Sequence, residues 1–200
     1  MQGGLVDAIT QAYRDPRRVM ARLMADGPRE PRSLFHLMLA AGILFVASLP
    51  NAIRAAQRLE IDDAQTGAIA AHLFGYVFLL PLLVYALAAL VHLVARAFGG
   101  RGGFGGARAA VFWSALLGAP IALILALLGA GVEAATGRGQ LLWLDLLGYA
   151  GLGFWLWLFA ANIAEAEGFA ITRVLLTVGI GFGVVASGLA VVSGALTVAG

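Results

Sequence analysis

The chain has 200 residues, of which 61% are hydrophobic and 12% are charged, and its mean hydropathy is +0.91. Because about a quarter of the residues in an ordinary soluble domain are charged, this composition excludes that class and predicts a membrane protein. The net charge of +2 is small, and the lack of cysteine excludes disulfides, thiolate nucleophiles and cysteine-ligated metal centres.

Residues 1–32 carry scattered charges and lack the apolar core of a secretory signal peptide, so we expect them to be retained. Apolar residues recur at helical spacing up to Tyr13. The pair Asp15-Pro16 then resembles an N-cap followed by proline, which predicts a second short helix over residues 16 to about 25. This helix is amphipathic, so it either lies in the lipid headgroup layer or packs under the transmembrane bundle from the cytosol.

Five apolar stretches follow, each long enough to cross a hydrocarbon core of about 30 Å as a helix. Pro81 should kink or tilt the second helix, because proline removes a backbone hydrogen bond, and the third span contains Pro120. We therefore predict an all-α, polytopic protein with five transmembrane helices, at about residues 33–53, 67–97, 109–131, 141–161 and 174–198.

The arginines predict the orientation of these spans. With the N-terminus in the cytoplasm, ten of the thirteen arginines lie on the cytoplasmic side, and only Arg54, Arg58 and Arg138 lie outside. We expect a multi-pass protein of the inner (cytoplasmic) membrane, with a cytoplasmic N-terminus and a periplasmic C-terminus.

A glycine-rich elbow, residues 96–108, joins the second and third spans. It contains the pattern G-x-G-x-x-G from Gly100 to Gly105, but a membrane helix precedes it in place of a strand, and no acidic residue follows about twenty positions later. We interpret the glycines as a tight turn with positive φ, not as a dinucleotide site. Candidate contacts to phosphate headgroups are the arginines of the elbow and of the N-terminal segment: Arg17, Arg18, Arg22, Arg101 and Arg108.

Several short motifs resemble the bacterial branch of the Yip family, the Ypt/Rab-interacting membrane proteins. They are a long span ending in Arg-Ala-Phe-Gly-Gly, then Arg-Gly-Gly-Phe-Gly-Gly-Ala, then Gly118-Ala119-Pro120 within a span, and an aromatic fourth span. Residues 15–20 also resemble the segment that often precedes the first span in that branch. The resemblance implies an all-helical, five-span protein, often dimeric or bound to other membrane proteins.

The eukaryotic members of that family are linked to vesicle traffic and small GTPases. Their Asp-Leu-aromatic-Gly-Pro signature is absent ahead of the first span of this chain. The resemblance therefore transfers neither the trafficking role nor any functional residue.

Ionisable groups inside the predicted spans are candidates for function, because burying them is costly. His72 and Asp145 lie at similar predicted depths near the outer face, where they would form either a proton relay or a polar clamp between helices. His36 and His92 lie near the inner face on neighbouring helices, as a bis-histidine haem requires, but neither helix has a second histidine at suitable spacing.

The fifth span carries small residues at four-residue spacing, at Gly179, Gly183 and Ser187, which lets helix backbones approach closely. This candidate packing seam serves either contacts within the chain or a homodimer interface.

No set of side chains predicts catalysis or a metal site, and we expect Glu165 and Glu167 on a solvated inner loop. We therefore predict a non-enzymatic scaffold that organises membranes or binds proteins, with no cofactor. Its expected partners are the bilayer, anionic lipid headgroups and itself or other membrane proteins, but no nucleic acid. The alternative is a small proton-coupled transporter or channel that uses His72 and Asp145.

Overall fold

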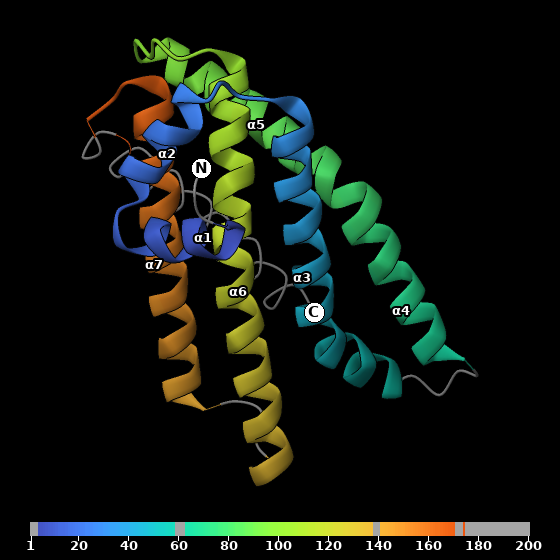
Figure 1. The fold of residues 1–200 in the computed structure, drawn as a ribbon. Helices are drawn as coiled ribbons and strands as arrows, with labels where there is room; N and C mark the ends of the chain where they lie inside the picture. Colours follow the sequence, from blue (N-terminus) through green and yellow to red (C-terminus); the bar gives the residue numbers. More distant parts are fainter. Residues whose placement is uncertain (1–3, 59–62, 138–140, 171–173, 175–200) are drawn as a thin grey trace, which may run out of the picture.

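The computed structural model describes residues 4–58, 63–137, 141–170 and 174. Regular structure in these residues is helical throughout, which confirms the all-α prediction (Figure 1). The helices are, in chain order, α1 (Leu5–Arg14), α2 (Pro16–Ala25), α3 (Glu30–Gln57), α4 (Ala64–Phe74), the π-helix η1 (Gly75–Leu79), α5 (Leu80–Ala97), α6 (Phe104–Thr136) and α7 (Leu142–Glu167).

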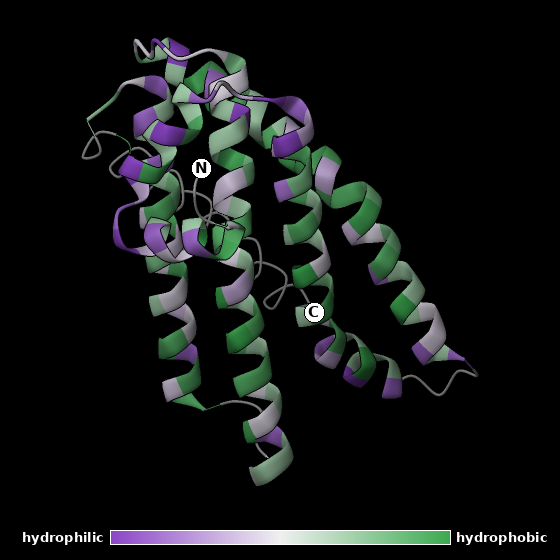
Figure 2. Cartoon of the chain, viewed as in Figure 1, coloured by the Kyte–Doolittle hydropathy of each residue, from purple (hydrophilic) through white to green (hydrophobic). Residues whose placement is uncertain are grey.

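Four helical segments of the described chain are long and apolar enough to cross a membrane: α3, the continuous run α4–η1–α5, α6 and α7. Figure 2 shows hydrophobic residues along most of their length. They overlap the first four predicted spans and are several residues longer; α6, for example, runs from Phe104 to Thr136, where the sequence predicted about 109–131. The predicted fifth span, 174–198, lies outside the described residues except for Val174.

The proline of the second span changes how the helix winds. Pro81 has no N–H to donate to the carbonyl four residues earlier, and the π-helix η1 lies immediately before α5, the helix in which this proline is the second residue. At this junction the N–H of Leu80 donates to the carbonyl of Gly75, five residues earlier. The irregularity expected from the sequence is therefore a π-turn between α4 and α5.

The elbow reverses the chain through a glycine in the left-handed region. Gly99 has φ +86°, and its N–H donates to the carbonyl of Arg96 over 3.1 Å, while the N–H of Gly100 donates to the carbonyl of Ala95 over 2.8 Å. These two bonds make a Schellman motif at the end of α5. Gly103, in extended conformation, then caps α6, so the predicted positive-φ turn is present.

The two N-terminal helices pack against the bundle. α2 contacts α7, and α1 contacts α6. The apolar side chains of α2 that face inward, Val19, Met20 and Leu23, are buried. Of the two positions that the sequence left open for α2, the structure has the one in which its apolar face packs on protein.

The described helices form a bundle that is closed at one end and open at the other. Near its start α6 is buried, and Phe112 and Trp113 are no more than 1% exposed. Further along the helix, Ile124 and Leu127 are more than half exposed. In Figure 1 the pair α6 and α7 separates from the pair α3 and α4 away from the elbow. We call the half of the bundle that carries the elbow, α2 and α1 the closed end, and the opposite half the open end; α1 lies furthest from the elbow, beside Leu117 of α6.

Candidate interaction surface at the closed end

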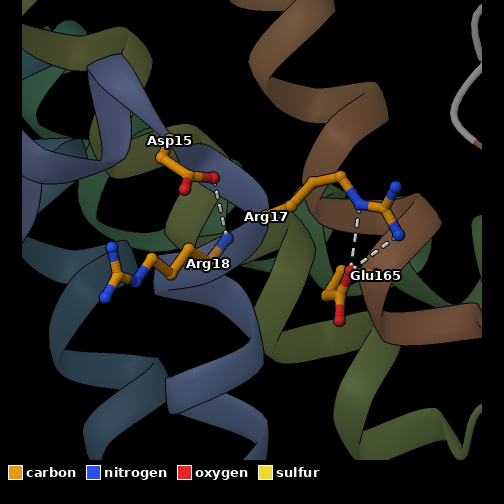
Figure 3. A network of polar contacts seen from close by, with 4 residues as sticks. All are labelled: Asp15, Arg17, Arg18 and Glu165. Carbon is orange, nitrogen blue, oxygen red and sulfur yellow. Dashed lines mark hydrogen bonds and ion pairs between the residues drawn. The ribbon is translucent and has the colours of Figure 1, made fainter.

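An ion pair between the second and the last described helix holds α2 in place. The guanidinium of Arg17 on α2 lies 2.9 and 3.0 Å from Oε2 of Glu165 on α7. In Figure 3, Arg17 points toward α7 while Arg18 points away from it. Asp15 starts the helix, because its Oδ1 accepts from the backbone N–H of Arg18 over 3.1 Å.

A tyrosine attaches α1 to the bundle. The hydroxyl of Tyr13 donates to the carbonyl of Leu117 on α6 over 2.7 Å, and its ring lies 5.9 Å from that of Phe154 on α7. Burial raises the pKa of Tyr13, so the hydroxyl keeps its proton and stays a donor at neutral pH. Helices α1 and α2 are thus fixed by specific contacts as well as by apolar burial.

Arg108 is used inside the chain. Its Nη1 lies 3.0 Å from Oε2 of Glu30, and its guanidinium lies over the rings of Tyr85 and Phe104 at 5.9 and 5.7 Å. The hydroxyl of Tyr85 donates to the other carboxylate oxygen of Glu30 over 2.9 Å. This predicted headgroup contact therefore joins α6, α5 and the start of α3.

The remaining predicted headgroup contacts lie on the surface. Arg18, Arg22 and Arg101 are exposed. Arg22 also donates to Oε1 of Gln11 over 2.9 Å, which links α2 to α1. We call α1, α2 and the turn of residues 98–103 the platform.

A pair of a partly buried histidine and a buried glutamate lies beneath the turn. Nδ1 of His92 lies 2.8 Å from Oε1 of Glu167, a side chain that is 1% exposed. A Cβ atom at Gly100 or Gly102 would lie 2.9 or 2.8 Å from Oε2 of Glu167, so only glycine lets the turn approach this closely. The N–H of Arg101 also donates to the carbonyl of Glu167 over 3.0 Å.

The prediction that Glu165 and Glu167 lie on a solvated loop after the fourth span is wrong. Glu165 and Glu167 belong to α7, which continues to Glu167 and ends at Gly168 with φ +74°. The helix persists because Ala160, Ala161 and Ala164 are fully buried or nearly so against the bundle. Sequence reasoning missed the His92 pair, since the two residues are 75 positions apart.

The histidines near the closed end have separate partners. The ring of His36, a buried residue of α3, packs on Trp113 of α6 with centroids 4.9 Å apart. His92 is instead bonded to Glu167. These contacts do not pair His36 with His92, so they do not form the bis-histidine haem site that was considered from the sequence.

The structure does not bring His72 and Asp145 together. Nδ1 of His72 lies 2.9 Å from the carbonyl of Ala68 in its own helix, α4, and Asp145 is exposed in the first turn of α7. Figure 1 shows α4 and α7 on opposite sides of α3 and α6. The described contacts therefore give no support to a proton path through this pair.

A polar contact layer fixes α7 on α6. Nδ2 of Asn162 donates to Oγ of Ser114 over 2.9 Å, and both residues are fully buried. Nε1 of Trp155 donates to the carbonyl of Ser114 over 2.9 Å. Buried polar bonds of this kind specify one register between two helices.

The contacts described so far do not involve the predicted packing seam of the fifth span or a metal site. The seam of Gly179, Gly183 and Ser187 lies outside the described residues. Among the described residues, no group of three or more histidine, aspartate or glutamate side chains could hold a metal ion.

Comparison with known protein families identifies the family of the chain. A family model described as the Yip1 domain matches residues 10–194, which takes in nearly the whole chain, including α2 and the second half of α1. No curated protein and no solved structure matches the chain.

Proposed function

Because the chain belongs to the Yip1 domain family and is a multi-pass membrane protein, we propose that it is a membrane-organising scaffold whose platform binds anionic lipid headgroups. It would belong to the bacterial branch of the family and lie in the inner membrane, with the closed end in the cytoplasm. The Yip1 domain is not an enzyme family, and we propose no catalytic role.

The observation that carries this proposal is an excess of exposed arginine on a fixed surface. Arg14, Arg18 and Arg29 are exposed near α1 and α2, and Arg101 is exposed on the turn. Three of the nearby acids pair with arginines: Glu165 with Arg17, Glu30 with Arg108, and Asp26 with Arg32. Asp7 and Asp15 accept hydrogen bonds from backbone N–H groups, so fewer exposed acids than exposed arginines face the solvent. The exposed guanidinium groups are thus left to attract phosphate.

The arginine distribution also supports the orientation. Ten arginines fall on the side of the closed end in the five-span topology, as expected for a cytoplasmic face. That leaflet carries the anionic lipids, and each arginine near it contributes about 1 kcal/mol.

We predict that the triple variant Arg14→Gln, Arg18→Gln, Arg101→Gln loses the preference for anionic lipid. The protein would be placed in nanodiscs with spin-labelled phosphatidylglycerol or phosphatidylcholine, and the immobilised lipid fraction measured for each. At about 1 kcal/mol per arginine, or about 3 kcal/mol for all three, the relative affinity for phosphatidylglycerol should fall on the order of a hundredfold.

Arg58→Gln is the matched control, because Arg58 is exposed at the open end of α3. It should leave the preference unchanged. An unchanged preference in the triple variant, or an equal loss in the control, would refute headgroup binding by the platform.

A further inference from the structure

The two members of the ion pair between Arg108 and Glu30 differ in burial. The side chain of Arg108 is only 12% exposed, and its guanidinium lies over the rings of Tyr85 and Phe104. The side chain of Glu30 is 56% exposed. Water can solvate the glutamate if it moves away, whereas the guanidinium would stay largely buried without a counter-charge. The pair therefore combines a fixed cation with an anion that can be exchanged.

The position of Glu30 in the chain favours this exchange. Glu30 is the first residue of α3, and the N-cap before it, Arg29, makes no side-chain hydrogen bond to the helix. Pro31 comes next, and a residue before proline is disfavoured in the helical conformation. Rotation of the side chain, or fraying of this end residue, would release the carboxylate while the rest of α3 stays in place.

One donor of Arg108 has no acceptor. The two oxygens of the Glu30 carboxylate are both used: Oε2 lies 3.0 Å from Nη1 of Arg108, and Oε1 accepts from the hydroxyl of Tyr85 over 2.9 Å. Nε of Arg108 is buried and has no hydrogen-bond partner among the described residues. A terminal phosphate group presents three acceptor oxygens, and arginine binds phosphate through two parallel N–H···O bonds. A phosphate can therefore satisfy the donor that the glutamate leaves unpaired.

We propose that Arg108 and Tyr85 form a binding site for a terminal phosphate group, and that Glu30 occupies this site as an internal competitor. Arg108 is the fifth residue of α6, about 6 Å from the start of the helix at the closed end. A terminal phosphate reaches this position either on a lipid headgroup, as in phosphatidic acid, or from solution. The site lies outside the platform, so it does not depend on headgroup binding there.

The affinity of the full chain for phosphate in mild detergent tests the proposal. Native mass spectrometry would count bound phosphatidic acid, and equilibrium dialysis would measure binding of radiolabelled inorganic phosphate. Glu30→Gln keeps the shape of the side chain and removes its charge. We expect a gain in affinity on the order of tenfold, because the ligand no longer displaces a charge-assisted hydrogen bond. A gain with phosphatidic acid alone would identify a lipid site, and a gain with inorganic phosphate would identify a site for soluble phosphates.

Two further variants show where the gain arises. Addition of Arg108→Gln to Glu30→Gln should abolish it, and this double variant leaves no unpaired charge at the site that would prevent folding. Gel filtration would verify that each variant is folded. Asp145→Asn is the charge control, because Asp145 is exposed in the first turn of α7, at the open end. It changes the net charge as Glu30→Gln does and should leave the affinity unchanged.

Either of two results would overturn the proposal. If Glu30→Gln leaves the affinity for both ligands unchanged or lowers it, Glu30 is only a structural partner of Arg108. If the gain persists in the double variant, or if Asp145→Asn reproduces it, the phosphate binds elsewhere on the chain or responds to net charge alone.

Discussion

Glu167 places a carboxyl group in the interior of the closed end. Its Oε1 is bonded to His92, and its Oε2 is buried with no hydrogen-bond partner among the described residues. A buried carboxylate without a partner strongly destabilises the folded state. The contact with His92 therefore contributes to the stability of the fold, because no other side chain among the described residues bonds to this carboxylate. The glycines of the turn cover the carboxylate with backbone.

We predict that His92→Leu destabilises the folded protein by about 3 kcal/mol, because it leaves the Glu167 carboxylate buried without its partner. Thermal unfolding in mild detergent would measure the change. His72→Leu is the matched control and should cost less than about 1 kcal/mol, since His72 bonds only to a carbonyl of its own helix. Similar losses in the two variants would contradict a special contribution from the buried pair.

Sequence reasoning reached only part of this residue-scale detail. It placed arginines at the headgroup level, but it could not tell that Arg108 is held by Glu30 and two rings while Arg18 stays exposed. Local spacing predicts which face of a helix a residue occupies, not which distant partner it meets. The Glu167 pair depends on such a long-range contact.

At the scale of elements, α6 is the helix on which the others are assembled: α3, α5 and α7 all pack against it, and α1 reaches it too. Gly118 of α6 lies directly against Trp155 of α7. A Cβ atom there would lie 2.5 Å from Cδ1 and 2.6 Å from Nε1 of Trp155. The carbonyl of Ser114, which Trp155 bonds, is one turn away.

Gly118→Ala should therefore displace the Trp155 indole and break its hydrogen bond, at a cost of about 1–3 kcal/mol. Thermal unfolding, together with a change in tryptophan fluorescence, would report both effects. Gly129→Ala in the same helix has no atom within 4 Å of its Cβ and should be neutral or stabilising by up to about 1 kcal/mol, because alanine favours helix. Equal behaviour of the two variants would refute the close contact.

Helix positions were predictable because apolar length and turn glycines are local properties of the chain. The form that the Pro81 irregularity takes was not, since proline permits a kink, a tilt or a π-turn. Nor could the sequence show that α7 continues past 161 to Glu167. That extension depends on burial of its last turns against α2 and α6, which is a tertiary effect.

At the scale of the whole molecule, the closed end depends on the attachment of α1 and α2. Tyr13→Phe should remove the bond to the Leu117 carbonyl while keeping the ring, at a net cost of about 1 kcal/mol. Local opening of α1 should then be about fivefold more frequent. Hydrogen exchange of the α1 amides in nanodiscs would show it as a matching increase in rate.

Tyr149→Phe is the control, because Tyr149 is 72% exposed and its hydroxyl has no bond to the platform. It should leave exchange in α1 unchanged. If Tyr13→Phe also leaves the α1 rates unchanged, apolar burial alone attaches this helix.

Composition predicted the membrane class, and the Yip1 domain match and the apolar helices support it. The difference between a closed and an open end could not be predicted from the sequence, because both halves of α6 are mostly apolar and only the neighbouring helices decide which half is covered. His72 and Asp145 show the same limit. Equal depth in the membrane did not make them neighbours, since α3 and α6 stand between their helices.

The ion pair of Arg17 with Glu165 joins residues 148 positions apart. At about 5–20 residues per second, a ribosome that has made α2 needs on the order of 7–30 seconds more to make its partner surface on α7. During that interval Val19, Met20 and Leu23 have no α7 to cover them. An amphipathic helix with arginines on its other face can bind to the surface of the bilayer during this time. The closed end is therefore completed only after the fourth span has been inserted.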